Sequence, residues 1–531
     1  MGIPSYYKRL IDKFPKLVQR GFQALPRSDI LLMDFNCLIY QCVRSAGVYK
    51  AEERDAWEAR LIEAVKAYTV EVWGAAGRPR EVFIAVDGVV PMAKIRQQRL
   101  RRFKAPWWAA AEREAGVRAA ETWDTNAITP GTEFMEKLAA GLRSLCAARG
   151  AGWSVSAADE PGEGEQKLMG WVRGRAGDSP KALAGKEIVV YGLDADLIVL
   201  SLLSLARTAP TVASWGLLRE LAEFERDGRQ GVFGLLNVKE LLGILVPHGQ
   251  SAADYMLEYV CAMSFLGNDF LPHSLTVKMR EDGHEKMRRT LHDLHREGQH
   301  LVGPGGHVQK RAAAAFVAAW AEAEEELLVE AVGHKYKARG PPPRTDAERA
   351  MQRTQNLPLE WREEAAICTG IGADKDSGVP LCLTADWRET YYRRWLRGAD
   401  TVAAVRIYEQ GLQWILDYYT GKPVSYSWYF PWNLPPLWGD LRRGLESGAE
   451  VCEAPPVSAP VGPQEQLAMV LPMSSWGLVR RADLRALPVR APAFWPDRFG
   501  FFSTGKRWMW ECEAEVPVLS VERLRRLLGG V

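Results

Sequence analysis

Three short runs of apolar residues punctuate the first part of the chain. They are Ile30–Met33, Val82–Val86 and Ile188–Tyr191. Short apolar runs of β-branched or large side chains predict buried strands. A longer stretch between the first two, Asp55–Val72, places apolar residues at helical spacing and predicts a helix. Strands that alternate with helices predict an α/β fold with a twisted, mostly parallel central sheet flanked by helices.

Two proline-rich stretches follow further along the chain. The first lies near Lys335–Pro358 and contains three consecutive prolines, and the second is Ala454–Pro463. We therefore divide the 531 residues into an α/β region at 1–335, a linker at 336–358 and a second region at 359–531. The second region is rich in Trp, Tyr and Pro, and nothing requires it to fold alone.

The composition, 47% hydrophobic and 25% charged, is ordinary for a globular protein and excludes long disorder. The net charge of +2 decides nothing about a polyanionic partner, because clusters of opposite sign can cancel. We expect no membrane association, since the chain lacks an apolar run of about 18 residues and an apolar signal core. The 8 cysteines include no C-x-x-C pair, which predicts a reducing compartment, the cytoplasm or the nucleus, and no secretion.

Acidic residues follow each of the three predicted strands. Asp34 comes after the first run, Asp87 after the second, and Asp194 and Asp196 after the third. Aspartate is depleted in strands and costly to bury, so its recurrence at three strand ends points to function. Ligands of open α/β sheets bind outside the carboxyl ends of the strands, where acids from parallel neighbours would converge.

Two further segments, Pro161–Glu165 and Gly267–Pro272, add Glu163, Glu165 and Asp269. Glu163 and Glu165 would not share a face of a regular helix, so either one binds through water or the adjacent glycines distort the turn. Seven clustered carboxylates need divalent cations, and oxygen ligands favour Mg²⁺ or Mn²⁺. Two ions about 3.5–4 Å apart would activate a water and stabilise the leaving oxygen of a phosphodiester. The alternative is a set of helix caps and surface turns.

A basic segment, Pro91–Lys104, begins four residues after Asp87 and contains no acid. As a helix it places Lys94, Gln98, Arg101 and Arg102 on roughly one side, next to the acids. A helix N-terminus with basic side chains nearby binds phosphate, whereas the alternative is a solvated helix face. Further on, His292, His295 and His300 are interpreted as part of a solvated helix, since other zinc-type ligands do not accompany them in the sequence.

At this point the sequence resembles a known family, the XRN 5′-to-3′ exoribonucleases, within the wider superfamily of flap-type 5′ nucleases. The first region carries the motifs Met1–Tyr7, Asp34–Asn36, Val86–Lys94, Gln97–Phe103, Ile128–Met135, Pro161–Glu165, Tyr191–Ile198 and Leu266–His273. The second region carries Tyr408–Leu416, Ser427–Trp432, Gln464–Pro472 and Phe494–Trp510. The resemblance thus covers nearly the whole chain.

The resemblance implies a PIN-like, flap-type 5′ nuclease fold, with a helix-rich second region packed around it and completing the active-site pocket. It also implies catalytic residues that hold Mg²⁺, with Mn²⁺ as the alternative and two ions expected: Asp34, Asp87, Glu163, Glu165, Asp194, Asp196 and Asp269. Lys94, Gln98, Arg101 and Arg102 would bind a 5′-monophosphate, and Tyr40 and Trp428 would stack on the 5′ bases. Tyr40 and Gln166 stand where the family usually has histidines, so no imidazole role carries over to them.

The implied activity is a processive, Mg²⁺-dependent 5′-to-3′ exoribonuclease in RNA decay. It would degrade single-stranded RNA with a 5′-monophosphate to nucleoside 5′-monophosphates, as a monomer. Two alternatives remain: a structure-specific flap-type nuclease acting on DNA, and a catalytically silent scaffold that binds nucleic acid. Because the sequence stops just after the family's catalytic core, we expect a minimal version of it, of the kind that a virus or a reduced genome would encode.

Overall fold

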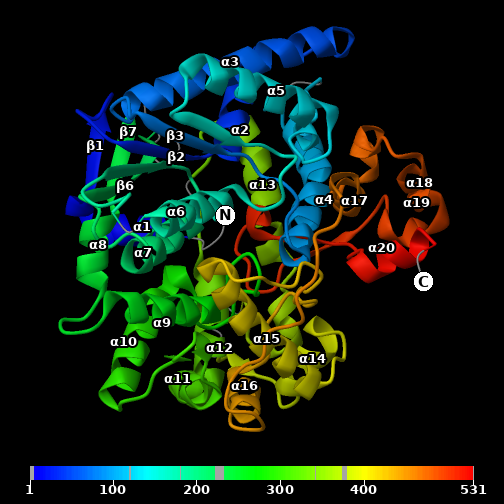
Figure 1. Cartoon of the computed structure of the whole chain (residues 1–531). Helices are drawn as coiled ribbons and strands as arrows, with labels where there is room; N and C mark the ends of the chain where they lie inside the picture. Colours follow the sequence, from blue (N-terminus) through cyan, green and yellow to red (C-terminus); the bar gives the residue numbers. More distant parts are fainter. Residues whose placement is uncertain are drawn as a thin grey trace.

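The computed structural model describes residues 5–118, 121–179, 181–221, 232–340, 342–372 and 379–529 (Figure 1). Met1–Pro4, the first residues of the N-terminal motif, lie outside these ranges. A seven-stranded sheet of order β1-β7-β6-β5-β2-β3-β4 forms the centre. Its strands are β1 (Val18–Phe22), β2 (Ile30–Asp34), β3 (Glu81–Ala85), β4 (Trp153–Ser156), β5 (Glu187–Tyr191), β6 (Ser214–Glu220) and β7 (Phe233–Asn237).

The pairing in this sheet is mostly parallel. The strands from β4 through β3, β2 and β5 to β6 all run in one direction. The strand β7 pairs antiparallel with β6, and β1 pairs antiparallel with β7. The three predicted strands are confirmed as β2, β3 and β5, and the mostly parallel α/β sheet is confirmed with them.

Helices cover both faces of the sheet. Side chains of β2 alternate between two hydrophobic clusters, Leu31 and Met33 in one and Ile30 and Leu32 in the other. One cluster is closed by α2 (Asn36–Ser45), α3 (Arg54–Ala75) and α5 (Glu133–Arg149), and the other includes α6 (Gly164–Asp178), α7 (Asp196–Arg207) and α8 (Val238–Leu245). Burial on both faces explains why the central strands read as unbroken apolar runs. The predicted helix Asp55–Val72 is confirmed within α3.

A helical layer lies beyond α7, in the lower half of Figure 1. Its helices are α9 (Ala252–Phe265), α10 (Gly283–Arg296), α11 (Lys310–Glu322), α12 (Glu324–Lys337), α14 (Trp387–Trp395), α15 (Thr401–Thr420) and α16 (Trp438–Leu445). The ring of Phe265 on α9 lies 6.3 Å from that of Tyr408 on α15 and 6.5 Å from that of Trp438 on α16. The second predicted region therefore shares a core with the first, and its helix-rich packing around the α/β part is confirmed.

The long helix α4 (Met92–Glu114) joins the sheet to the C-terminal elements. These include α17 (Pro463–Val470), α18 (Ala482–Arg485), α19 (Leu487–Arg490) and α20 (Val521–Leu527), on the right of Figure 1. The buried guanidinium of Arg99 on α4 donates to the carbonyl oxygens of Pro517 at 2.8 Å, Met469 at 2.7 Å and Phe494. A buried charge is costly without partners, so these bonds anchor three separate C-terminal segments to α4.

Much of the predicted linker is helical. The helix α13 (Asp346–Glu360) occupies its second half and contacts α4. Three two-stranded ribbons complete the fold: β8 (Val302–Gly303) with β9 (His307–Val308), β10 (Cys368–Thr369) with β11 (Cys382–Leu383), and β12 (Gly500–Phe502) with β13 (Glu513–Glu515). The division at 1–335, 336–358 and 359–531 stays a prediction. Within the described ranges, every helix is too short or too polar to cross a bilayer.

A buried relay of hydrogen bonds links α1 (Tyr6–Lys13), α9 and α10. The hydroxyls of Tyr6 and Tyr259 lie 2.6 Å apart, and the Tyr259 hydroxyl lies 2.7 Å from Nε2 of His284. Burial, reinforced by the positive charge of Arg288, lowers the pKa of His284 from 6.5 to about 4. Between these two values the unfolded chain binds more protons than the native protein, so stability is lost as the pH falls through this window.

We expect the free energy of unfolding, measured with urea, to decrease from pH 7 to pH 5. The variant His284→Gln should flatten this slope, by at most about 1.4 kcal/mol per pH unit, because its side chain does not titrate. The matched control is His292→Gln on the same helix, whose side chain is 59% exposed. A slope in His284→Gln equal to that of the unmodified protein would show that His284 is not the titrating group.

Candidate functional site

The carboxyl ends of β2, β3 and β5 meet at a switch in the sheet topology. β3 and β4 lie on one side of β2, whereas β5 and β6 lie on its other side. Connections that leave in opposite directions open a crevice at this point, where ligands of α/β proteins bind. Asp34 is the last residue of β2, Asp87 lies just beyond β3, and Asp194 lies just beyond β5.

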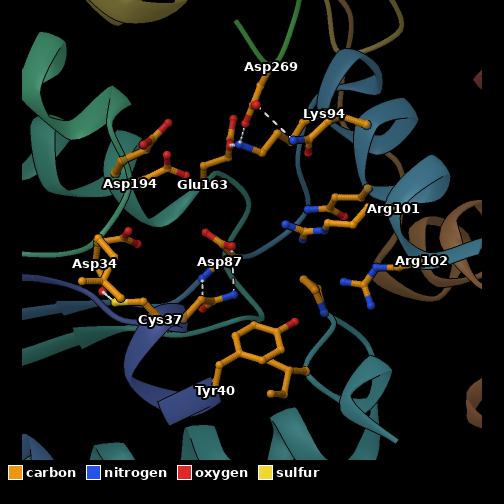
Figure 2. A pocket seen from close by; sticks show the side chains of 17 residues that line it. Asp34, Cys37, Tyr40, Asp87, Lys94, Arg101, Arg102, Glu163, Asp194 and Asp269 are labelled. Atoms are coloured by element: carbon orange, nitrogen blue, oxygen red, sulfur yellow. Dashed lines mark hydrogen bonds and ion pairs between the residues drawn. The ribbon is translucent and has the colours of Figure 1, made fainter. Parts of the chain in front are cut away.

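A pocket occupies this crevice, and Figure 2 shows the side chains that line it. Six of the seven acids singled out in the sequence are among them: Asp34, Asp87, Glu163, Glu165, Asp194 and Asp269. The seventh, Asp196, begins α7 and is buried, outside the pocket lining. The acids that follow the predicted strands, apart from Asp196, therefore line one cavity. Their role as metal ligands stays a prediction.

Backbone and side-chain donors fix the position of Asp87. Its Oδ2 accepts a hydrogen bond from Nδ2 of Asn36 at 2.8 Å, and its own backbone N–H donates to Oδ1 of Asn36 at 3.1 Å. Its Oδ1 accepts from the backbone N–H of Gly164 at 2.7 Å. A side chain at position 164 would place its Cβ 2.6 Å from Oδ1 of Asp34, so this approach requires glycine. Asn36 and Gly164 are therefore positioning residues, a role that the pattern of acids in the sequence does not indicate.

Glu163 and Glu165 both line the pocket although they are two residues apart. Glu163 is the N-cap of α6, with the extended dihedrals φ −69° and ψ 148°, whereas Glu165 lies in the first helical turn. The change of backbone conformation between them lets both side chains reach one cavity. The two residues therefore do not both belong to the helix, and whether each binds directly or through water stays a prediction.

Lys94 bridges two of the acids across the pocket. Its Nζ lies 2.6 Å from Oε2 of Glu163 and 2.6 Å from Oδ2 of Asp269. Burial alone would lower the pKa of Lys94, but Asp269 and Glu163 raise it well above its usual value. Two neighbours complete this arrangement: Tyr418 donates to Oε1 of Glu163 at 2.8 Å, and Gln97 donates to Oδ1 of Asp269 at 3.0 Å. The sequence alone did not indicate that Tyr418 contacts Glu163 or that Gln97 contacts Asp269.

Burial and mutual repulsion make three of the other acids, Asp34, Glu165 and Asp196, hard to ionise. Burial, followed by the charges of Asp87 and Asp194, raises the pKa of Asp34 well above its usual value. Burial together with neighbouring acids does the same for Glu165 and Asp196. Within the described residues, both carboxylate oxygens of Asp196 and Oε1 of Glu165 are buried without a hydrogen-bond donor. Clustered hard oxygens that lack donors are the ligand set that Mg²⁺ or Mn²⁺ requires, so these residues fit a divalent cation.

The predicted basic helix is confirmed as α4, and Lys94, Gln98, Arg101 and Arg102 all line the same pocket. Figure 2 shows the two arginines facing the acids from the α4 side. Arg102 donates to Oδ1 of Asn126 at 3.0 Å, which holds its guanidinium in place. Burial lowers the pKa of Arg102 to about 10, so it remains charged at neutral pH. The pocket therefore has an acidic side and a basic side.

The two predicted stacking residues have different surroundings. Tyr40, from α2, lines the pocket below Asp87 in Figure 2. Trp428 is absent from the lining and is buried, with its ring stacked on Trp414 at 5.3 Å between centroids. A Cβ at Gly411 would come within 2.9 Å of the Trp428 ring, so glycine permits this close packing. Base stacking by Trp428 stays a prediction, and in this structure Tyr40 is the better placed of the two.

Two family models match this sequence: XRN 5′-3′ exonuclease N-terminus over residues 1–212, and Xrn1 helical domain over residues 374–529. The chain is 28% identical to 5′-3′ exoribonuclease 1 of Homo sapiens, over 99% of this chain and 34% of the relative. It is 26% identical to 5′-3′ exoribonuclease 2 of Yarrowia lipolytica, over 99% of this chain and 68% of the relative.

A third relative, 5′-3′ exoribonuclease 2 of Saccharomyces cerevisiae, is 36% identical over 53% of this chain and 34% of its own length. The chain thus spans about a third of the human and S. cerevisiae proteins. Among solved structures, the catalytic core of Rad2 in complex with DNA substrate has a TM-score of 0.32 and 12% identity, over 74% of this chain and 95% of that chain. A likeness this distant supports no argument about the fold.

The unpartnered carboxylate of Asp196 leads to a prediction about stability. Asp196→Asn removes a buried carboxyl group whose ionised form Asp194 and Asp269 repel, so we expect the melting temperature in EDTA to rise by about 2–4 °C. The same variant should lose much of the stabilisation that Mg²⁺ gives if Asp196 is a ligand, as the sequence predicts. Scanning calorimetry with EDTA and with Mg²⁺ measures both effects. Asp178→Asn, at an exposed position, is the control, and equal Mg²⁺ responses in the two variants would contradict the assignment.

Proposed function

Because the chain belongs to the XRN family of 5′-3′ exonucleases, we propose that it degrades RNA from the 5′ end as an exoribonuclease. We further propose that it acts in RNA decay and releases nucleoside 5′-monophosphates processively. The observation that carries this proposal is the shared pocket, in which Lys94 joins the acidic side to the basic side. Cleavage chemistry and recognition of a terminal phosphate can therefore take place in one pocket.

We assign the acidic side to metal binding: Asp34, Asp87, Glu163, Glu165, Asp194, Asp196 and Asp269 would hold two Mg²⁺, with Mn²⁺ as the alternative. When bound, such ions supply an activated water and stabilise the leaving oxygen of a phosphodiester. The contribution of the protein's own residues is to hold these carboxylates in position. Asn36 and the backbone of Gly164 hold Asp87, Tyr418 holds Glu163, and Gln97 holds Asp269. Fixed ligands do not need to reorganise during the reaction.

The basic side is proposed to bind the 5′-monophosphate through Lys94, Gln98, Arg101 and Arg102. A terminal monophosphate offers charge-assisted hydrogen bonds to these donors, whereas a 5′-hydroxyl offers none. A triphosphate or a cap would have to fit additional groups beside the side chains of α4 that line the pocket. This difference would give the enzyme its direction, because only the 5′ end of a strand with a monophosphate can be anchored.

Single-stranded RNA is the proposed substrate, with Tyr40 stacking on a base near the anchored end. Trp428 is proposed as a second stacking partner, which requires its ring to move away from Trp414. The 8 free thiols support a reducing compartment, the cytoplasm or the nucleus, and we propose that the protein acts there as a monomer. Action on branched DNA and a catalytically silent scaffold are the rival functions.

Decay of single-stranded RNA labelled at its 3′ end tests the phosphate pocket. We expect the 5′-monophosphate substrate to disappear with Mg²⁺ and to persist with EDTA. Arg101→Ala should reduce the preference for a monophosphate over a hydroxyl by about 10–100-fold, since a hydrogen bond to a charged group contributes about 1.5–3 kcal/mol. The control is Arg113→Ala, an exposed position further along α4.

Three outcomes would overturn parts of this proposal. Equal rates on monophosphate and hydroxyl ends would reject the phosphate pocket. Cleavage within branched DNA while RNA stays intact would favour the flap-type nuclease. Binding of RNA without any decay, at all Mg²⁺ and Mn²⁺ concentrations, would favour the silent scaffold.

A pair of substitutions at Tyr40 separates stacking from hydrogen bonding. Tyr40→Phe keeps the ring and should degrade monophosphorylated RNA at close to the normal rate. Tyr40→Ala removes the stacking surface and should raise the KM for RNA by about 5–100-fold, the equivalent of 1–3 kcal/mol per stacked base. Steady-state kinetics measures the effect. A large loss in Tyr40→Phe would instead assign the role to the hydroxyl.

A further inference from the structure

The interpretation of the three neighbouring histidines as one solvated helix is wrong for His295. His292 and His295 both lie on α10, and His300 follows that helix. The side chain of His292 is exposed as expected, but that of His295 is only 6% exposed. His300 remains 60% exposed, yet it is held by the same buried group as His295. This group is a carboxylate in the helical layer, and its residue does not line the first pocket.

Glu258 on α9 brings these two histidines together. Its Oε2 lies 2.9 Å from Nε2 of His295, and its Oε1 lies 2.9 Å from Nδ1 of His300. The backbone N–H of Leu301 also donates to Oε2 at 2.8 Å, which fixes the orientation of the carboxylate. One ligand atom from each of Glu258, His295 and His300 lies within 4.8 Å of the other two. Two imidazoles and a carboxylate thus converge from α9, α10 and the segment before β8.

Within the described residues, no lysine or arginine forms an ion pair with Glu258. Its side chain is 4% exposed, and its ion pairs within the described ranges are with His295 and His300 alone. A buried carboxylate facing two neutral imidazoles keeps an uncompensated charge, which is costly in the protein interior. Either an imidazole is protonated, or a metal ion lies between the three groups.

The surroundings of His295 are compatible with a metal. Nε2 of Gln250 lies 3.1 Å from Nδ1 of His295, on the side of the ring away from Glu258. Rotating this amide by half a turn exchanges its nitrogen and oxygen, so that Oε1 accepts a hydrogen bond from Nδ1–H. Nε2 is then free of its proton and available as a ligand. Metal-bound histidines are held in this way, through their second nitrogen and an oxygen acceptor. The ring of Tyr255, edge-on at 5.9 Å, packs against the imidazole.

We propose that Glu258, His295 and His300 form a second metal site, specific for a transition metal such as Zn²⁺. Imidazole nitrogens suit Zn²⁺, whereas the all-oxygen ligands of the first pocket suit Mg²⁺, so the two sites select different ions. The exposed His300 provides a path from solvent, and water would complete the coordination. This inference concerns other residues than the proposed nuclease chemistry and does not depend on it.

The expected role of this ion is structural. It would clamp α9 to α10 through Glu258 and His295, and it would hold the chain after α10 through His300. α9 runs directly into Gly267–Asp269, and Asp269 lines the first pocket. A metal that fixes α9 would therefore stabilise the element that leads to Asp269. Glu258 precedes Asp269 by a stretch of chain equivalent to about three helical turns.

Zinc binding to the full-length protein tests the proposal. The protein is stripped with a chelator and titrated with Zn²⁺ in a large excess of Mg²⁺, which occupies the carboxylate pocket. We expect one Zn²⁺ per chain by calorimetry, and a higher melting temperature with Zn²⁺ than without it. His300→Ala should weaken this binding at least tenfold and abolish the thermal shift. Because His300 is exposed, the variant should fold normally, and its circular dichroism and melting temperature in EDTA verify this.

Two further variants make the result specific. His292→Ala, an exposed histidine on the same helix, should bind Zn²⁺ as the unmodified protein does. Asp194→Asn removes an acid from the first pocket and should also keep this Zn²⁺, whereas Glu258→Gln should lose it. Absence of Zn²⁺ binding in the unmodified protein, or equal Zn²⁺ affinities of the unmodified protein, His300→Ala and Glu258→Gln, would overturn the proposal. In that case a protonated imidazole would balance the charge of Glu258.

Discussion

Repulsion between buried carboxylates is the constraint on which the arrangement of this molecule depends. Acids gathered at one edge of a sheet oppose folding unless donors and cations compensate them. The structure supplies part of this compensation itself, through the ammonium of Lys94, the amide of Asn36 and the backbone N–H of Gly164. The compensation is incomplete, as the unpartnered oxygens of Asp196 indicate. Stability is therefore sacrificed locally at the site that we propose to bind divalent cations.

The sequence predicted the parts of this site that depend on local pattern. Asp34, Asp87 and Asp194 could be placed together because the strands before them are apolar runs, and parallel strands end at one edge. Other strands could not be predicted from apolar runs. β4 is a four-residue strand with two serines, and β6 and β7 contain glycine, so none of them has an unbroken apolar run. The core of the sheet was thus predictable, and its outer strands were not.

Residues that act over long sequence distances could not be found from pattern alone. Tyr418 contacts Glu163 from the second region, and Gln466 accepts the backbone N–H of Val90, just after the acid of β3. Arg99 reaches three C-terminal carbonyls. The local sequence around these residues does not indicate which distant residue each one contacts. Because of these contacts, the second region is better described as packed against the first region than as a separate module.

The position of Lys94 couples the two halves of the pocket. A single ammonium cannot neutralise Glu163 and Asp269 and also bind a phosphate at full strength. Under the proposed function, a divalent cation on these acids would release Lys94 from neutralising them, so that it could turn to the phosphate. By thermodynamic linkage the phosphate would then strengthen cation binding by the same factor. The bridge would therefore make occupancy of the pocket cooperative: without the metal the protein would hold the end of the strand weakly, and with both ligands present each would retain the other.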